Sequence, residues 1–156
     1  MKISNKFLLL ISFLLFACGN NKKKYSLNAK YVVEKQVKGI NFGVYVLSEN
    51  EKDSSLNIAL KINAIDNSNI LKYGILDQTA YLQRIYYFSY QIENDLWIEQ
   101  NGIKIPCAGA VFERNYNLTK DVTITVHFDN VVKNNKKVLV YYPQPFDLIP
   151  VKFKLK

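Results

Sequence analysis

Few side chains in this 156-residue chain could do chemistry: one histidine, two cysteines and thirteen acidic residues. His127 precedes Asp129 by two residues, so an acid–base pair or a metal site is the chemistry that its position allows. A zinc site built on one histidine would have to recruit carboxylates or Cys107, and no spacing favours this. We interpret His127 as a solvent-facing strand residue and Cys107 as a small buried apolar residue.

Motifs for catalysis are missing from the sequence. It contains no Gly-rich phosphate loop, no Gly-x-Ser-x-Gly and no His-Glu-x-x-His. A glycosidase needs two carboxylates a few ångströms apart, but any chain with thirteen acids offers such pairs. The acids that could meet in space to form such a pair are Glu93, Asp95, Glu99, Glu113 and Asp121. We predict no enzyme, no metal and no cofactor, and keep a small hydrolase as the weakest alternative.

The amino terminus has the pattern of an export signal. Lys2 and Lys6 precede the apolar run 7–17, whose one polar interruption is Ser12. This run of eleven residues is about half of the roughly 20 that a helix needs to span a bilayer. A basic start, a short apolar middle and a small residue at the exit are typical of a secretory signal peptide.

The exit point carries a more specific pattern. Leu15-Phe16-Ala17-Cys18 resembles the lipobox of bacterial lipoproteins. The resemblance implies transfer of diacylglycerol to the Cys18 sulfur, cleavage before Cys18 and acylation of the new amino terminus. It covers the leader alone and assigns the rest of the chain to no family. Many Lys, Asn and Ile beside two Arg suggest a Bacteroidota-type organism.

Composition divides the chain into three parts. We expect a signal peptide over residues 1–17, a flexible basic tether over 18–29 and one domain over 30–156. Loss of Lys2 and Lys6 with the leader lowers the formal charge from +8 to +6, and three further lysines lie in the tether. The tether is a solvated spacer or also contacts anionic headgroups. No nucleic-acid partner is predicted.

The pattern of the domain predicts a series of short strands. Residues 56–62 and 122–128 alternate between apolar and polar side chains, as strands with one dry face do. Asn101-Gly102 between two apolar runs predicts a type I′ hairpin, and Pro106 predicts a strand end or an edge. Further strands are expected over 31–33, 42–47, 108–112, 138–142 and 151–155. The pattern predicts an all-β fold, an antiparallel β-sandwich of immunoglobulin-like arrangement, with a small barrel as the alternative.

The longest strand is expected over residues 81–92, which are rich in tyrosine. One parity of this strand would face the core: Leu82, Tyr86, Phe88, Tyr90 and Ile92. Tyr81, Gln83 and Tyr87 would then stand on the opposite face. Because tyrosine combines apolar area with a polar tip, these three form a candidate binding surface. The alternative is a central strand covered on both faces.

Glu113 and Arg114 complete the candidate surface. They lie in the most polar segment beside apolar sequence. One interpretation is that they pair with Arg84 or Asp121 and fix a corner of the sandwich. The other is that they belong to a loop that recognises a partner.

These features indicate where the protein works more clearly than what it does. We expect a membrane-anchored lipoprotein, held through Cys18, whose sandwich is a non-catalytic binding or accessory module of the cell envelope. An envelope protein or a polysaccharide is the expected partner. The alternative is a periplasmic inhibitor or immunity-type lipoprotein. The expected location is the outer membrane facing the periplasm, with the cell surface as the alternative.

Overall fold

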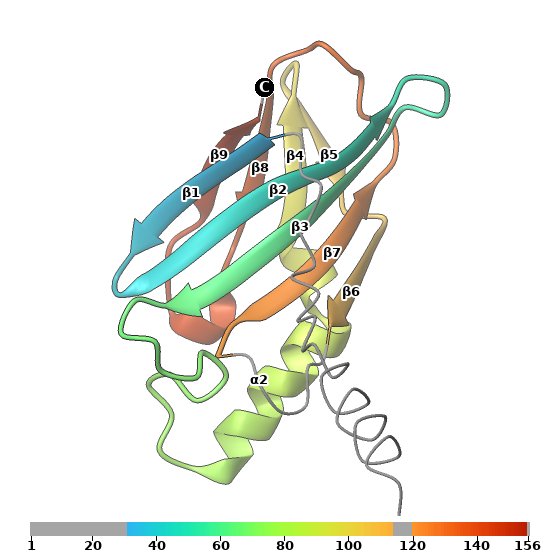
Figure 1. Cartoon of the computed structure of the whole chain (residues 1–156). Coiled ribbons are helices and arrows are strands. Elements are labelled where there is room, and N and C mark those ends of the chain that lie inside the picture. The colour runs from blue at the N-terminus through green and yellow to red at the C-terminus, as the bar shows by residue number, and fades with distance from the viewer. Residues whose placement is uncertain (1–30, 114–119, 156) are drawn as a thin grey trace, which may run out of the picture.

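The computed structural model describes residues 31–113 and 120–155. The expected signal peptide, the tether with Cys18, and Arg114 lie outside these residues. Two antiparallel sheets pack face to face, and one α-helix lies across one end of them (Figure 1). The predicted all-β sandwich is therefore confirmed for the described part of the chain.

All strand pairs in the two sheets are antiparallel. The five-stranded sheet has the order β1 (Tyr31–Val37), β2 (Ile40–Asn50), β3 (Ser55–Ala64), β7 (Val122–Phe128) and β6 (Gly109–Glu113). The four-stranded sheet has the order β5 (Ile103–Pro106), β4 (Leu96–Gln100), β8 (Lys137–Tyr141) and β9 (Val151–Leu155). Without β1, this order corresponds to the A-B-E-D and C′-C-F-G sheets of immunoglobulin-like sandwiches.

The core lies between the sheets, as the period-2 pattern predicts. Ile58 and Leu60 of β3 lie beside their cross-strand partners Val126 and Ile124 of β7, and all four are fully buried. Their polar neighbours in sequence lie on the outer face of the sheet, so burial of alternate residues fixes the register. At the predicted hairpin, Asn101 and Gly102 both have positive φ, which the type I′ turn requires.

The chain passes from one sheet to the other directly between β5 and β6. Pro106 ends β5 at the edge of the four-stranded sheet, as predicted. The Cys107 amide still donates to Leu96 of β4, whereas the Ala108 amide donates to His127 of β7. This two-residue crossing forms a corner of the sandwich.

The strand predicted over residues 81–92 is wrong, because α2 (Gln78–Tyr90) is an α-helix. Asp77 caps its start by accepting a hydrogen bond from the Ala80 amide at 2.9 Å. A short 3₁₀ helix, η2 (Ile92–Asp95), leads from α2 into β4. Tyr, Ile and Phe favour strands, so the composition concealed the helix. Phe88 is buried, but Tyr86 and Tyr90 are exposed instead of sharing its face.

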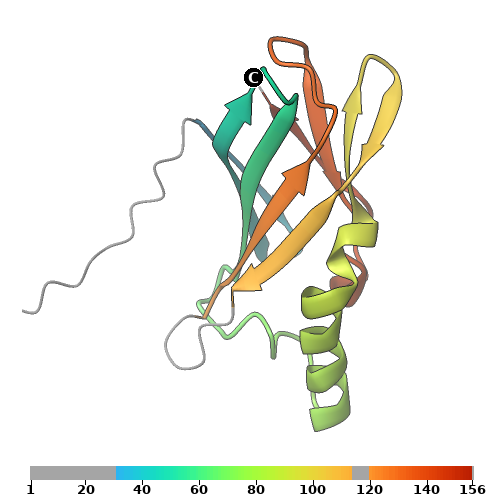
Figure 2. The same cartoon turned by 90° about the vertical axis from the view of Figure 1, so that its right-hand side faces the viewer.

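The helix closes one end of the sandwich (Figure 2). The Phe88 ring packs against Phe112 of β6 at 5.7 Å and against Phe146 at 6.3 Å between ring centroids. Phe146 belongs to a second 3₁₀ helix, η3 (Gln144–Phe146), which lies between β8 and β9. β1 starts at the opposite end of the sandwich, so Tyr31 lies far from α2 (Figure 1). Within the described residues, no helix has the length and apolar character to cross a bilayer.

Two alanine substitutions distinguish the helix from the predicted strand. Phe88→Ala is expected to lower the free energy of unfolding by about 3–5 kcal/mol, because it empties a buried aromatic site. Tyr86→Ala is expected to change it by less than about 0.5 kcal/mol, because this ring is on the surface. Urea unfolding of the purified variants measures both. Equal losses would show that the two side chains share the core, as the strand would require.

Candidate functional site

The outward side of α2 carries an exposed apolar stripe. Leu82, Tyr86 and Tyr90 are 54%, 55% and 65% exposed. Their spacing of four residues places them on one side of the helix. The rings of Tyr86 and Tyr90 lie 5.2 Å apart between centroids, so the two phenols form one surface. We refer to these three residues as the α2 aromatic face.

This face has no charge. From Gln78 to Ile92 the one charged residue is Arg84, and its side chain points inward with 8% exposure. A surface helix normally carries charged residues on its outer side. Depletion of charge together with exposed tyrosine is instead typical of the centre of a protein interface.

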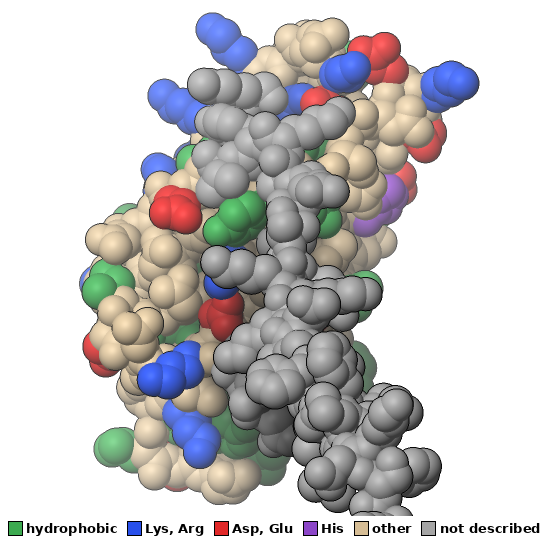
Figure 3. All heavy atoms as spheres, viewed as in Figure 1, with side chains coloured by type: hydrophobic (Ala, Val, Ile, Leu, Met, Phe, Trp, Pro, Cys, Tyr) green, Lys and Arg blue, Asp and Glu red, His purple; other side chains and the backbone are tan. Residues whose placement is uncertain are grey.

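Other segments at the same end of the sandwich also expose apolar side chains. Leu76 precedes the helix, and Tyr142 and Ile149 lie between β8 and β9; all three are exposed. In the space-filling view, hydrophobic side chains reach the surface at the lower end of the molecule, where Lys or Arg side chains are also present (Figure 3). The α2 aromatic face is therefore not the sole apolar surface that the described residues expose at this end.

Arg84 fixes the position of α2. Its Nη1 donates to the carbonyl oxygens of Ile70 and Tyr73 at 3.1 and 2.6 Å, and its Nη2 donates to that of Pro145 at 2.8 Å. The guanidinium also lies over the Phe146 ring, 4.7 Å from its centroid. Burial lowers the pKa of Arg84, although Tyr141 opposes this. One side chain thus joins the helix to two loops.

A second buried cluster holds the other half of the helix. The Tyr87 hydroxyl donates to Asp95 Oδ2 at 2.8 Å, and Gln144 Nε2 donates to Asp95 Oδ1 at 2.7 Å. Burial raises the pKa of Tyr87 and of the neighbouring Tyr141 well above the usual range. Both phenols therefore stay protonated at neutral pH, and the Tyr87 hydroxyl acts as a hydrogen-bond donor to Asp95.

A cavity of about 310 Å³ opens beside α2. Ala80, Gln83, Arg84 and Tyr87 line it from the helix, and Gln144 lines it from η3. Gln83 is exposed and one helical turn from Tyr86, so the cavity borders the α2 aromatic face.

The predicted candidate surface is not one surface. Tyr87 is buried, Tyr81 is half-buried with Lys72 5.7 Å from its ring centroid, and of the three on α2 only Gln83 is exposed. The expectation that they share a strand face is wrong, because on a helix Gln83 and Tyr87, four residues apart, lie on the side that lines the cavity, whereas Tyr81 points away from it.

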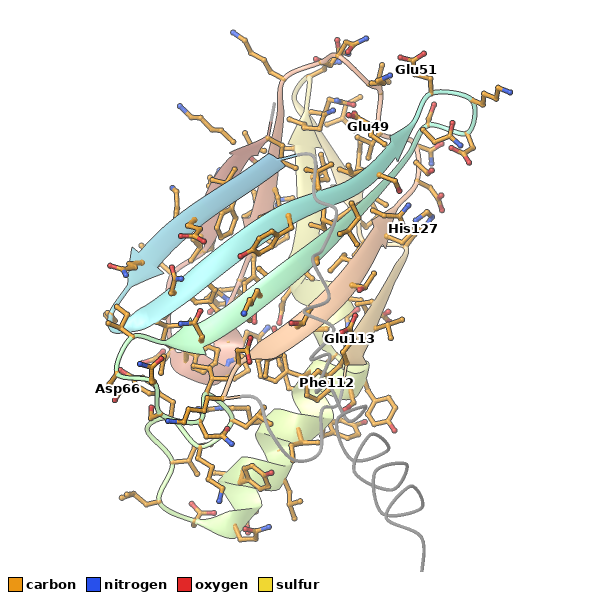
Figure 4. All side chains as sticks on the ribbon, in the orientation of Figure 1. Glu49, Glu51, Asp66, Phe112, Glu113 and His127 are labelled. Carbon is orange, nitrogen blue, oxygen red and sulfur yellow. The ribbon has the colours of Figure 1, made fainter. Side chains whose placement is uncertain are left out.

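Glu113 lies elsewhere, at the end of β6 (Figure 4). It is exposed and accepts a hydrogen bond from Thr125 at 3.3 Å, while Arg114 lies outside the described residues. Within the described residues, neither expected partner binds Glu113. Arg84 binds backbone carbonyls, and Asp121 pairs with Lys61 at 2.6 Å.

His127 lies on the outer face of β7, where the sequence placed it (Figure 4). Its Nδ1 is 2.8 Å from Asn57 Oδ1, and its Nε2 is 3.0 Å from Asp129 Oδ1. Both ring nitrogens therefore have side-chain partners, and one of them is the carboxylate of Asp129, the residue considered with His127 from the sequence. Among residues 31–113 and 120–155, no three His, Cys, Asp or Glu side chains gather closely enough to hold a metal ion.

Cys107 is half-buried at the corner between the sheets. Its sulfur lies 3.2 Å from the Gly109 carbonyl oxygen. Burial raises the pKa of the thiol to about 11, so it is almost entirely protonated at neutral pH. This environment suits an unreactive packing residue rather than a nucleophile.

Sequence reasoning placed the α2 aromatic face in the core. Two signals could have located it: Asp77 as a helix cap before residue 78, and a 15-residue stretch with one charge. Comparison with protein families, with curated proteins and with solved structures finds no match to this chain.

Arg84→Lys tests how the helix is held. An ammonium cannot reach carbonyls of two loops at once, so the free energy of unfolding is expected to fall by about 2 kcal/mol. Urea unfolding measures the change. The control Lys152→Arg, on the exposed surface of β9, is expected to stay within about 0.5 kcal/mol of the unsubstituted protein. An unchanged stability for Arg84→Lys would contradict the role of the guanidinium fork.

Proposed function

We propose that this protein is a lipid-anchored, non-catalytic binding module of the bacterial cell envelope that recognises a protein partner through the α2 aromatic face. The observation that carries the proposal is an exposed helix whose outward side is aromatic and uncharged. Such a surface matches the helix-in-groove mode, in which apolar side chains at four-residue spacing enter an apolar groove.

The position of the expected anchor supports this assignment. Residues 19–30 would connect a lipidated Cys18 to Tyr31, and a flexible chain of that length spans about 20 Å. Because Tyr31 lies at the end opposite α2, a tether from Cys18 would hold that end near the bilayer and turn α2 away from it (Figure 1). The recognition surface would then face the periplasm, or the medium if the lipoprotein is displayed on the cell surface.

A protein fits this face better than a polysaccharide does. Leu82 offers no hydrogen bond, and the two phenols are the only polar groups of the α2 aromatic face. Sugars present many hydroxyls that need paired polar groups, whereas an apolar groove gains most from burying leucine and tyrosine. The same face would also serve an inhibitor that blocks one toxin, so the identity of the bound protein separates the two alternatives.

The double variant Tyr86→Glu/Tyr90→Glu tests the proposal. Two carboxylates placed in an apolar groove are expected to weaken partner capture by at least about tenfold, because each would be desolvated without a counter-charge. The measurement is affinity capture from the native envelope with quantitative mass spectrometry. The quantity compared is the amount of a discrete protein that the unsubstituted chain retains and the double variant loses.

Ile103→Glu is the matched control. Ile103 is 64% exposed in the hairpin at the other end of the sandwich, so its substitution adds a similar charge far from α2. Capture is expected to survive this change. A partner that is retained equally by the double variant, or lost equally by the control, would contradict recognition through α2.

A further inference from the structure

The guanidinium of Arg84, which lines the cavity beside α2, has no counter-charge among the described residues. Arg84 supplies a charged wall, yet none of the ion pairs in residues 31–113 and 120–155 includes it. Buried charges are normally paired, because a lone charge loses its hydration without compensation. Within the described residues, the positive charge of Arg84 therefore remains without a negative partner.

The guanidinium also has hydrogen-bonding capacity left. It carries five N–H groups, of which Nη1 and Nη2 use three on loop carbonyls. Nε is buried without a hydrogen-bond partner in the described residues. Buried donors without partners are rare, so an unpaired donor on a side chain that lines the cavity favours a site for a polar group.

The rest of the lining is apolar or neutral. Ala80, Ile75 and the Tyr87 ring form the walls, and the amides of Gln83 and Gln144 add polar groups without charge. Asp95 bonds to two of the lining residues, and both of its oxygens already accept hydrogen bonds, from Tyr87 and from Gln144. The lining therefore offers one positive charge among apolar walls.

We infer that this cavity binds a carboxylate carried on an apolar body, presented by the protein that docks on the α2 aromatic face, with Arg84 as the residue that meets the carboxylate. The inference rests on the proposed function for its partner. The bordering position of Gln83 allows one docked protein to cover the face and insert this group. The three side chains of the face form a small interface alone, and an anchoring group in a pocket is what strengthens such interfaces.

The test needs no identified partner. N-acetylphenylalanine and its carboxamide differ only in the charged group, and each is titrated into the isotope-labelled full chain while the amide resonances are followed by NMR. The carboxylate is expected to shift the resonances of Ala80 and Gln83 saturably and to bind at least about fivefold more tightly than the carboxamide. Equal binding of the two probes, or no saturable shift with either, would overturn the inference.

Substitutions at Gln83 with opposite charges provide a second test. They are expected to change probe binding in opposite directions while the hydrogen bonds of Arg84 stay intact. Gln83→Lys is expected to tighten N-acetylphenylalanine binding by about threefold and Gln83→Glu to weaken it by about threefold, as a unit charge near the ligand does. Gln36→Glu, at an exposed position of β1 on the sheet, is the control and is expected to have no effect. Changes of the same sign for both Gln83 variants would also overturn the inference. Probe binding with unchanged partner capture by the Tyr86→Glu/Tyr90→Glu variant would reject the proposed function alone.

Discussion

The structure depends on how one buried arginine holds a helix across the open end of a sandwich. Arg84 reaches the loop after β3 and the loop after β8 with one planar group, so three separate segments become one surface. Its five fixed donors suit this task, which a lysine could not perform. With the inward side of α2 held by Arg84, Tyr87 and Phe88, the side that carries Tyr86 and Tyr90 has to face outward.

The two ends of the molecule are consequently different. The strands form a rigid body whose register is set by the burial of alternate residues. At one end this body meets the segment that leads to the expected lipid anchor, and at the other it presents a helix whose outward side is uncharged. Function placed on loops and helices at one end of a rigid sandwich is a common arrangement, because the scaffold positions the site without taking part in it. The cavity beside α2 extends the same surface inward.

The sandwich could be predicted from sequence because its signals are local. Alternation in β3 and β7, and Asn101-Gly102 at a turn, each follow from a few neighbouring residues. The helix could not be predicted in the same way. A helix is recognised by a polar outer side, and here that side holds Leu82, Tyr86 and Tyr90, so the 3.6-residue period is lost. The exposed apolar residues that make α2 a candidate binding surface are also the ones that hid the helix in the sequence. Arg84 was equally hidden, because its partners are backbone carbonyls, which have no signature in sequence.

Crosslinking in living cells tests the central claim most directly. A photoreactive phenylalanine analogue is placed at position 86, and in a separate strain at position 103 as the control. Position 86 is expected to give one discrete protein adduct on irradiation, and position 103 none of the same mass. Adducts to lipid at position 86, or the same protein adduct from both ends of the sandwich, would contradict a recognition surface on α2.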